Sequence, residues 1–281
     1  MKNSGLTCLI TGADSGFGKA IAKTLARQEY QLILISNNYE RLNSVKVEIV
    51  NEIQNTDIEI FCVDLSLQCE IKLFCAEFKS RFKKLDLLIN NAGVNIPFKK
   101  QTSEGFEYMF AVNYLAPVLL TSLLLEKIEK SENGRIINIG SNGEKFAVLD
   151  FENLQGEKSF NGMSQYCITK LCLLMYTYEL GEKLIEKNIS ACCLHPGGIR
   201  TAIMNNYKRY SIPKIAWYFL YPFLKKPGKA SKYILNLLNL EPSIIHGKYF
   251  FKEKPGKSSQ TSLNKVLISN LWEKTSELVL V

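Results

Sequence analysis

Short apolar runs alternate with longer amphipathic stretches along the chain, and this alternation restricts the possible folds more than any other feature. Seven runs rich in apolar and β-branched residues are predicted to be strands: residues 6–10, 32–35, 58–63, 85–89, 136–139, 190–194 and 248–251. Six stretches between them show helical periodicity: residues 19–27, 41–53, 70–82, 106–130, 166–187 and 230–240. The apolar strands favour a parallel sheet covered on both faces. Right-handed crossovers then predict an α/β, doubly wound Rossmann fold with a mainly parallel seven-stranded sheet and helices on both faces.

The alternation contains no repeat, low-complexity segment or linker, so we expect a single Rossmann-type domain over residues 1–281. One long departure, at about residues 201–228, is rich in Tyr, Trp and Phe and precedes the last predicted helix. Because long irregular insertions are usually functional, we expect this one to cover the substrate.

The charge balance restricts the partners. The chain has 35 Lys and Arg against 27 Asp and Glu, a net charge of +8, which suits nucleic acid, an anionic membrane surface or a phosphorylated ligand. The basic residues are scattered and form no nucleic-acid module, so nucleic acid is disfavoured. No N-terminal signal is visible, and no apolar stretch reaches spanning length; the closest, residues 215–224, contains Pro222. We therefore expect a cytoplasmic protein.

The eight cysteines do not resemble a disulfide framework. Those expected in core strands are Cys8, Cys62, Cys192 and Cys193, and those expected on a helix are Cys167 and Cys172. We interpret them as buried, reduced thiols. The two histidines, His195 and His246, have no metal-ligand companions at useful spacing, so no metal site is expected.

A glycine-rich loop joins the first predicted strand to the first predicted helix. The loop residues expected to contact a cofactor are Gly12, Ser15, Gly16, Phe17 and Gly18. Glycines there let the backbone turn tightly and approach a pyrophosphate, which the helix N-terminus stabilises. An ordinary turn would also tolerate three glycines, but their place between a strand and a helix favours a dinucleotide-binding loop.

The end of the second predicted strand bears on the choice of cofactor. A carboxylate there would hold the adenosine ribose and repel a 2′-phosphate, but this strand ends in Ser36 and Asn37. Arg41 follows and can either pair with a phosphate or remain a solvated charge. The absence of a carboxylate at this position weakly favours NADP(H) over NAD(H) as the cofactor. Asp14, in the glycine loop, is expected to cap the following helix.

Tyr166 and Lys170 lie four residues apart at the start of a predicted helix and therefore share a face. A nearby ammonium lowers the pKa of a phenol, which would make Tyr166 a general acid or base. The same spacing occurs in two further pairs that a proline interrupts: Tyr210 and Lys214 with Pro213, and Tyr221 and Lys225 with Pro222. The spacing alone does not identify the catalytic tyrosine.

An ordered series of motifs supplies the context. Its members are Thr11-Gly12-x-x-x-Gly16-x-Gly18, Asp64, Asn90-Asn91-Ala92-Gly93, Asn113, Ser141, Tyr166-x-x-x-Lys170 and His195-Pro196-Gly197. With this series the chain resembles the short-chain dehydrogenases/reductases over essentially its whole length. The resemblance implies a catalytic set whose members are Tyr166, Lys170, Ser141 and Asn113.

The resemblance also implies a role for each residue. Ser141 would hydrogen-bond the substrate oxygen, Lys170 would also bind the nicotinamide ribose, and Asn113 would hold a water in a proton relay. Further cofactor contacts, with Tyr166 and Lys170, would come from Ser36, Asn37, Asp64, Leu65, Asn91, Ala92, Gly93, Pro196, Gly197 and Thr201. Taken singly, Ser141 could be a polar strand end and Asn113 a helix cap. His195 is interpreted as structural and left out of the site.

A closer resemblance is to the retinol dehydrogenase and WW-domain oxidoreductase-like branch. Its marker is a long serine-to-tyrosine spacer, here residues 150–158, which we call the spacer. Gly105-Phe106-Glu107 and Leu271-Trp272 also fit. Three positions depart from the usual pattern: Phe17, Asn37 and Gly140.

These features predict an oxidoreductase that transfers a hydride between NADP(H) or NAD(H) and a carbonyl or alcohol. The resemblance suggests a lipophilic substrate, such as a retinoid, steroid or fatty aldehyde. Residues 215–224, with the lysines that follow to residue 229, fit an apolar lid, a peripheral membrane contact or a helix packed on its own domain. A homodimer would use the helices that hold Asn113 and Tyr166. Alternatives are a non-catalytic NADP(H)-binding sensor or scaffold and a biosynthetic ketoreductase for a more polar substrate.

Overall fold

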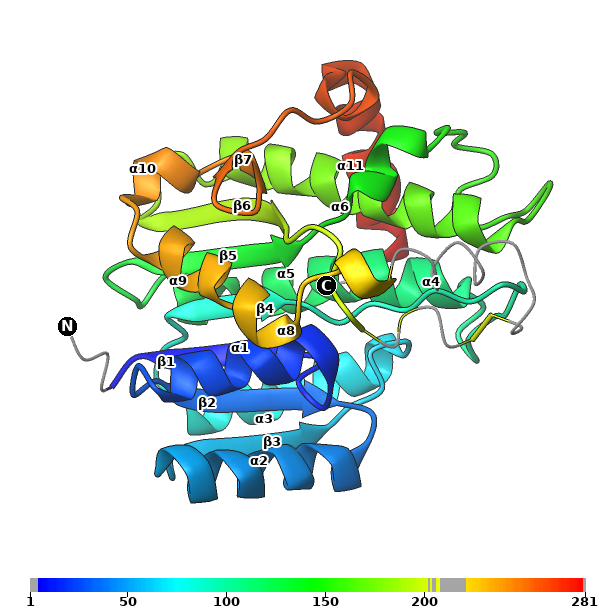
Figure 1. Cartoon of the computed structure of the whole chain (residues 1–281). Coiled ribbons are helices and arrows are strands. Elements are labelled where there is room, and N and C mark those ends of the chain that lie inside the picture. Colours follow the sequence, from blue (N-terminus) through cyan, green and yellow to red (C-terminus); the bar gives the residue numbers. More distant parts are fainter. Residues whose placement is uncertain (1–4, 202, 204–205, 208–220, 280–281) are drawn as a thin grey trace.

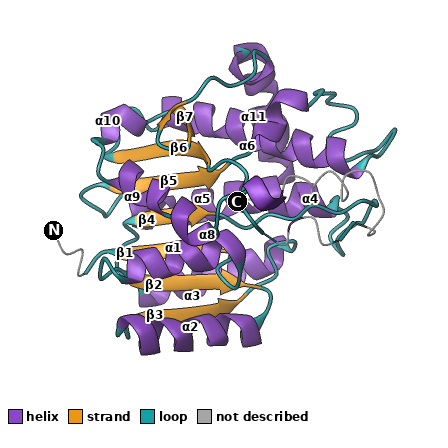
Figure 2. Ribbon diagram, viewed as in Figure 1, coloured by secondary structure: helices purple, strands orange, loops and turns teal. Residues whose placement is uncertain are grey.

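The computed structural model describes residues 5–201, 203, 206–207 and 221–279, and in these ranges it has a mainly parallel sheet between two layers of helices (Figures 1 and 2). The eight strands of the described part are ordered β3-β2-β1-β4-β5-β6-β7-β8. They are β1 (Thr7–Thr11), β2 (Gln31–Ser36), β3 (Ile58–Cys62), β4 (Leu87–Asn90), β5 (Gly134–Ile139), β6 (Ile189–His195), β7 (Lys248–Phe251) and β8 (Lys254–Pro255). The doubly wound α/β fold is confirmed. Only the two-residue antiparallel β8 was not predicted.

The helices agree with the predicted positions, with three differences. The α-helices are α1 (Gly16–Ala26), α2 (Tyr39–Ile53), α3 (Gln68–Arg81), α4 (Tyr108–Phe110), α5 (Ala116–Ile128), α6 (Gly162–Lys183), α8 (Pro227–Ala230), α9 (Lys232–Leu238), α10 (Pro242–Ile245) and α11 (Lys265–Leu278). The predicted helix 106–130 is divided by a π-helical turn, η1 (Ala111–Leu115). Helices α8, α10 and α11 were not predicted, and the predicted helix 230–240 corresponds to α9. Short 3-10 turns are η2 (Asn142–Phe146), η4 (Tyr221–Phe223) and η5 (Thr261–Leu263).

Each face of the sheet has its own apolar core. In β2, Leu32 and Leu34 pack toward α1, α2 and α9, whereas Ile33 packs in the opposite core with α3, α5, α6 and α11. Successive strand side chains point to opposite faces, and because both faces are covered all of these residues are fully buried. Burial of each such side chain contributes about 1.5–3 kcal/mol.

The apolar helix through α4, η1 and α5 corrects one expectation. Residues 108–128 have the length and the composition of a membrane span, with a mean hydropathy of 1.7, although the sequence was interpreted as containing no such stretch. Of its most apolar 18-residue stretch, 78% is buried, because α3 and α6 pack on this helix. It is the central helix of one core.

The prediction of buried, reduced thiols is correct except at Cys62 and Cys69, which are exposed. All eight cysteines are free, and those in the inner strands, including Cys8 and Cys193, are buried. Cys62 ends the outer strand β3 and is exposed, because no strand covers that edge of the sheet among the described residues.

The insertion predicted at about residues 201–228 falls largely outside the described residues, which exclude 202, 204–205 and 208–220. The apolar segment 215–220 and the Tyr210/Lys214 pair therefore lie outside them. Of the other competing pair, Tyr221 lies in η4 and Lys225 forms a parallel bridge with Ile199. As Pro222 predicts, these two residues do not share a regular α-helical face.

Candidate active site

A groove of about 740 Å³ runs along the carboxyl ends of the strands, where open α/β sheets bind their ligands. The predicted site residues that line it are Gly12, Ser15, Gly16, Phe17, Ser36, Asn37, Asp64, Leu65, Asn91, Ala92, Gly93, Ser141, Tyr166, Lys170, Pro196, Gly197 and Thr201. The two predicted residues that do not line it are Gly18 and Asn113. The fold thus brings nearly the whole predicted set to one groove.

The glycine loop has the conformation expected of a phosphate-binding turn. Gly12 and Gly16 have φ angles of +63° and +54°, which favour glycine. A Cβ added to Gly18 would lie 2.1 Å from the Gly12 carbonyl oxygen. Gly18 therefore acts by letting α1 pack closely against the loop, which explains its absence from the groove wall.

The N-terminus of α1 is left free of side-chain caps. Its N-cap residue, Ser15, makes no side-chain cap hydrogen bond, and the first turn holds no acidic residue. The prediction that Asp14 caps this helix is wrong: its carboxylate instead lies 3.8 Å from the Arg41 guanidinium on α2. Unpaired helix N–H groups beside a glycine turn suit an anionic pyrophosphate, so these residues fit a dinucleotide cofactor.

Thr11 and Asn91 hold the glycine loop against the end of β4. The Thr11 hydroxyl accepts hydrogen bonds from the Asn91 and Ala92 amides at 3.0 and 2.9 Å. The Asn91 side chain donates to the Thr11 and Gly12 carbonyls at 2.9 and 3.2 Å. Asn91 therefore shapes the loop besides lining the groove.

At the end of the groove near β2 and β3, the residues that end β2 bring no carboxylate to the groove. Ser36 is buried, Asn37 is exposed, and the Arg41 side chain is 68% exposed at the same place. The Asp64 carboxylate accepts the Ser66 amide at 2.9 Å, which orders the turn after β3.

At the other end of the groove, Tyr166 and Ser141 face each other. A Cβ added to Gly143 would lie 3.4 Å from Ser141 Oγ and 3.6 Å from Tyr166 Cε1, so the two side chains border the same point. Ser141 Oγ also accepts the Gly143 amide at 3.1 Å and starts η2. Lys170 Nζ lies 5.9 Å from the Tyr166 ring centroid and donates to the Ile139 carbonyl at 2.9 Å.

The expectation that Lys170 lowers the pKa of Tyr166 is wrong for this structure. Burial raises the pKa of the Tyr166 phenol to about 12, and a hydrogen bond with Ser141 opposes this only in part. Burial also lowers the pKa of the Lys170 ammonium to about 8. Desolvation is the largest cause for both groups, so Tyr166 is a protonated phenol at neutral pH.

Asn113 lies behind the groove, in the π-helical turn η1. Its side chain is fully buried and pairs with both backbone groups of Val94, accepting its amide at 2.8 Å and donating to its carbonyl at 2.9 Å. It also donates to the Thr169 hydroxyl, which donates to the Tyr166 carbonyl at 2.8 Å. Asn113 thus connects the loop after β4 to the helix that carries Tyr166. Single π turns are frequent at functional sites.

His195 was left out of the site, yet it lines the groove beside Pro196. It is nine-tenths buried, its ring stacks on Phe251 at 5.2 Å, and its Nδ1 is buried without a hydrogen-bond partner among the described residues. Burial, helped by nearby lysines, lowers its pKa to about 4. Its position at the end of a predicted inner strand was the signal that could have included it.

The unusual glycine at position 140 also has a structural cause. A Cβ there would lie 2.5 Å from Cys193 Sγ on the neighbouring strand. Cys193 therefore fills the space that the usual serine side chain would need. The two positions are 53 residues apart in the sequence, and only the sheet register connects them.

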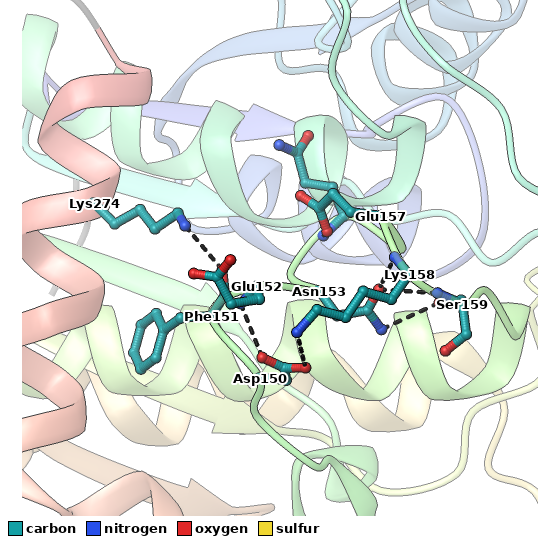
Figure 3. Close-up of polar contacts among 9 residues, drawn as sticks. Asp150, Phe151, Glu152, Asn153, Glu157, Lys158, Ser159 and Lys274 are labelled. Atoms are coloured by element: carbon teal, nitrogen blue, oxygen red, sulfur yellow. Dashed lines mark hydrogen bonds and ion pairs between the residues drawn. The ribbon is translucent and has the colours of Figure 1, made fainter.

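The spacer forms a loop held together by hydrogen bonds and an ion pair (Figure 3), and it does not line the groove. The Asn153 side chain accepts the Lys158 and Ser159 amides at 2.7 and 3.1 Å. Lys158 pairs with Asp150 at 3.3 Å, and Lys274 of α11 donates to the Phe151 carbonyl at 2.8 Å. The spacer is thus a folded element anchored on α11.

Comparisons with known proteins agree with this geometry. The family model described as short chain dehydrogenase matches residues 6–211. The chain is 31% identical to retinol dehydrogenase 11 of Homo sapiens over 276 residues, which are 98% of this chain and 86% of that protein. It is 32% identical to retinol dehydrogenase 12 of Mus musculus over 278 residues, with the same two coverages.

Two solved structures share the fold. A protein of Mycobacterium paratuberculosis superposes with a TM-score of 0.78 at 20% identity, covering 98% of this chain and 94% of that one. A short-chain dehydrogenase of Sphingobium yanoikuyae, in complex with NADPH, superposes with a TM-score of 0.68 at 21% identity, covering 97% and 93%.

Proposed function

The chain belongs to the short-chain dehydrogenase/reductase family, in its retinol dehydrogenase-like branch, and is an NAD(P)-dependent oxidoreductase; we propose that it interconverts a carbonyl and an alcohol on a lipophilic substrate, with Tyr166 as proton carrier. The supporting observation is that Ser141 and Tyr166 face one point of the groove, with Lys170 beside them, at the end opposite the Ser36 and Asn37 contacts. Turnover of NADPH or NADH with a panel of aldehydes, ketones and retinoids tests the proposal.

In the proposed reaction the protein orients the substrate and moves a proton. The bound nicotinamide supplies the redox chemistry. Ser141 Oγ and the Tyr166 hydroxyl hold the substrate oxygen, and the charge that develops on this oxygen is stabilised by both hydrogen bonds. Because the Tyr166 phenol is protonated at neutral pH, it can donate its proton during reduction. Lys170, largely protonated at pH 7, adds positive charge beside the phenol and can hold the nicotinamide ribose.

The substrate end of the groove supports a lipophilic ligand. Its side walls include Val94, Val112, Met163 and Ile203. The nearby polar groups pair with one another: the Asn206 amide donates to the Asn95 carbonyl at 3.1 Å, and the Tyr207 hydroxyl pairs with the Asn95 side chain at 3.0 Å. This leaves apolar surface for the substrate and weighs against the more polar ketone. The retinol named in the relatives fits the same class.

We propose NADP(H) as the preferred cofactor, because Ser36 and Asn37 bring no carboxylate to the groove and Arg41 lies there. Asn37→Asp should shift the ratio of kcat/KM for NADPH over NADH toward NADH by about tenfold or more, since an aspartate holds the ribose hydroxyls and repels a 2′-phosphate. Arg41→Ala should lower kcat/KM for NADPH about tenfold and leave that for NADH unchanged. Steady-state kinetics with both cofactors measure this, and equal losses for both cofactors would contradict it.

The sequence leaves the oligomeric state open, with a homodimer as one option, and we propose a monomer. Helix α11 covers the face that a dimer would use. The ring of Trp272 stacks on the Tyr176 ring of α6 with centroids 5.5 Å apart. The Thr275 hydroxyl forms a hydrogen bond of 2.6 Å with the Tyr114 hydroxyl of η1. Light scattering after size exclusion should therefore give about one chain mass, 31.9 kDa. A stable mass of twice that value would show that another face is used or that α11 moves away.

A further inference from the structure

Glu107 is a buried carboxylate that the catalytic scheme does not use. It is 1% exposed and forms no salt bridge among the described residues. Its two oxygens accept the Met109 and Phe110 amides at 3.0 and 2.8 Å, so it caps α4. That helix continues directly into η1, which holds Asn113. Glu107 therefore fixes the start of the segment that carries one predicted catalytic residue.

The same carboxylate reaches the helix of the catalytic tyrosine. The Gln165 side-chain amide lies near the Glu107 carboxylate, where α4 packs on α6, and it favours the charged form of Glu107; Gln165 immediately precedes Tyr166 in α6. Gln165 is 2% exposed, and its amide nitrogen also donates to the Leu154 carbonyl at 2.8 Å. Displacing Gln165 would therefore displace the first turns of α6, where Tyr166 lies.

The spacer completes this arrangement. The Glu107 backbone amide donates to Gln155 Oε1 at 2.9 Å, and Lys99 donates to the Gly156 carbonyl at 2.7 Å. The spacer is held together by its own hydrogen bonds and an ion pair (Figure 3), so the contact with Gln155 connects Glu107 to a folded element.

We propose that Glu107 is a positioning residue, which fixes the start of the helix that carries Tyr166 relative to the segment that carries Asn113. The contact between the spacer and Glu107 supports this arrangement. The proposal rests on the proposed function of Tyr166. A carboxylate suits the role because its two oxygens accept two backbone amides while its charge is stabilised by the neighbouring Gln165 amide. A shift of about 1 Å in a catalytic group can cost about 100-fold in rate.

The sharpest variant is Glu107→Gln, because it keeps the volume and turns one acceptor oxygen into a donor that faces other donors. Its matched control is Glu104→Gln. Glu104 lies in the same loop and accepts the Gln68 and Cys69 amides at 2.7 and 3.0 Å, and thus caps α3, which carries no predicted site residue. Both variants weaken a helix cap, but only Glu107 contacts the helix of Tyr166.

We expect Glu107→Gln to lower kcat by about 10- to 100-fold, with KM for NADPH within about twofold of wild type, and Glu104→Gln to leave kcat within about twofold. Wild-type kcat in Glu107→Gln, or an equal loss in Glu104→Gln, would overturn the proposal.

Amide hydrogen exchange followed by mass spectrometry gives a test that needs no turnover. Glu107→Gln should speed exchange in the α6 peptide that spans residues 162–170, whereas Glu104→Gln should speed it only near residues 68–72. Unchanged exchange at 162–170 in Glu107→Gln would reject the positioning role. A wild-type protein without turnover would reject the proposed function instead, so the two failures are distinguishable.

Discussion

Tyr166→Phe is expected to lower kcat by about 100- to 10,000-fold, the contribution of a positioned general acid. The substitution removes only the hydroxyl, which is the proton donor that faces Ser141 in the groove. Burial holds the phenol protonated at neutral pH, so the wild-type protein has a proton to donate there and the variant lacks it. Initial rates under saturating cofactor and substrate measure the loss.

Cofactor binding separates this chemical effect from misfolding. One lost hydrogen bond is worth about 0.5–1.5 kcal/mol, so the Kd of NADPH should rise by at most about tenfold in Tyr166→Phe. Fluorescence titration of NADPH measures this value. A loss of binding that matches the loss of kcat would mean that Tyr166 holds the cofactor and does not carry the proton.

Gly18→Ala is expected to have the largest effect on cofactor binding. Its Cβ would lie 2.1 Å from the Gly12 carbonyl oxygen and 2.6 Å from Asn91 Nδ2, closer than such contacts occur. The backbone of the loop or the start of α1 must therefore move, and the turn that faces the pyrophosphate moves with it. We expect the Kd of NADPH to rise by about 100-fold or more, equivalent to about 2.7 kcal/mol.

Gly228→Ala provides the matched control. An added Cβ there meets no atom within 4 Å, and Gly228 lies in the short helix α8, which packs on α1 but is not part of the glycine loop. This variant should keep the wild-type Kd and gain up to about 1 kcal/mol in stability. If Gly18→Ala bound NADPH with the wild-type affinity, the assignment of the glycine loop as the cofactor-binding turn would be contradicted. A global loss of structure, seen by circular dichroism, would call for Gly18→Ala to be compared at a lower temperature.

The fold could be predicted because its signals are local and repeated. In β2, Leu32, Ile33, Leu34 and Ile35 are all buried, two in each core, and a continuous apolar run of this kind indicates a strand covered on both faces. Helix α11 carried a comparable signal, with Ile268, Leu271 and Thr275 at helical spacing, but its packing on α6 depends on contacts across the fold.

The errors at the site share one physical cause, since burial and long-range contacts are not visible in a linear pattern. The Tyr166–Lys170 spacing predicts a lowered phenol pKa, but burial raises it. Asp14 stands where a capping residue is common, yet Arg41 from α2 attracts its carboxylate. Glu107 matched a branch motif, but its neighbour Gln165 lies 58 residues further along the sequence, and only the fold brings the two together.

The order of the motifs predicted the site better than any single motif did. Three Tyr-x-x-x-Lys pairs occur in the chain, and the structure places Tyr166 opposite Ser141 in the groove, whereas Tyr221 lies in a 3-10 turn. The roles of these residues in turnover remain predictions that the variants above address.

The most direct measurement compares wild type, Tyr166→Phe and Tyr221→Phe in one assay of NADPH consumption with retinoid, aldehyde and ketone substrates. The two variants lose the same hydroxyl from the same Tyr-x-x-x-Lys spacing, so they differ only in their place in the fold. We predict turnover in wild type and Tyr221→Phe and its loss in Tyr166→Phe. Equal turnover in all three proteins would contradict the assignment of Tyr166 as the proton carrier.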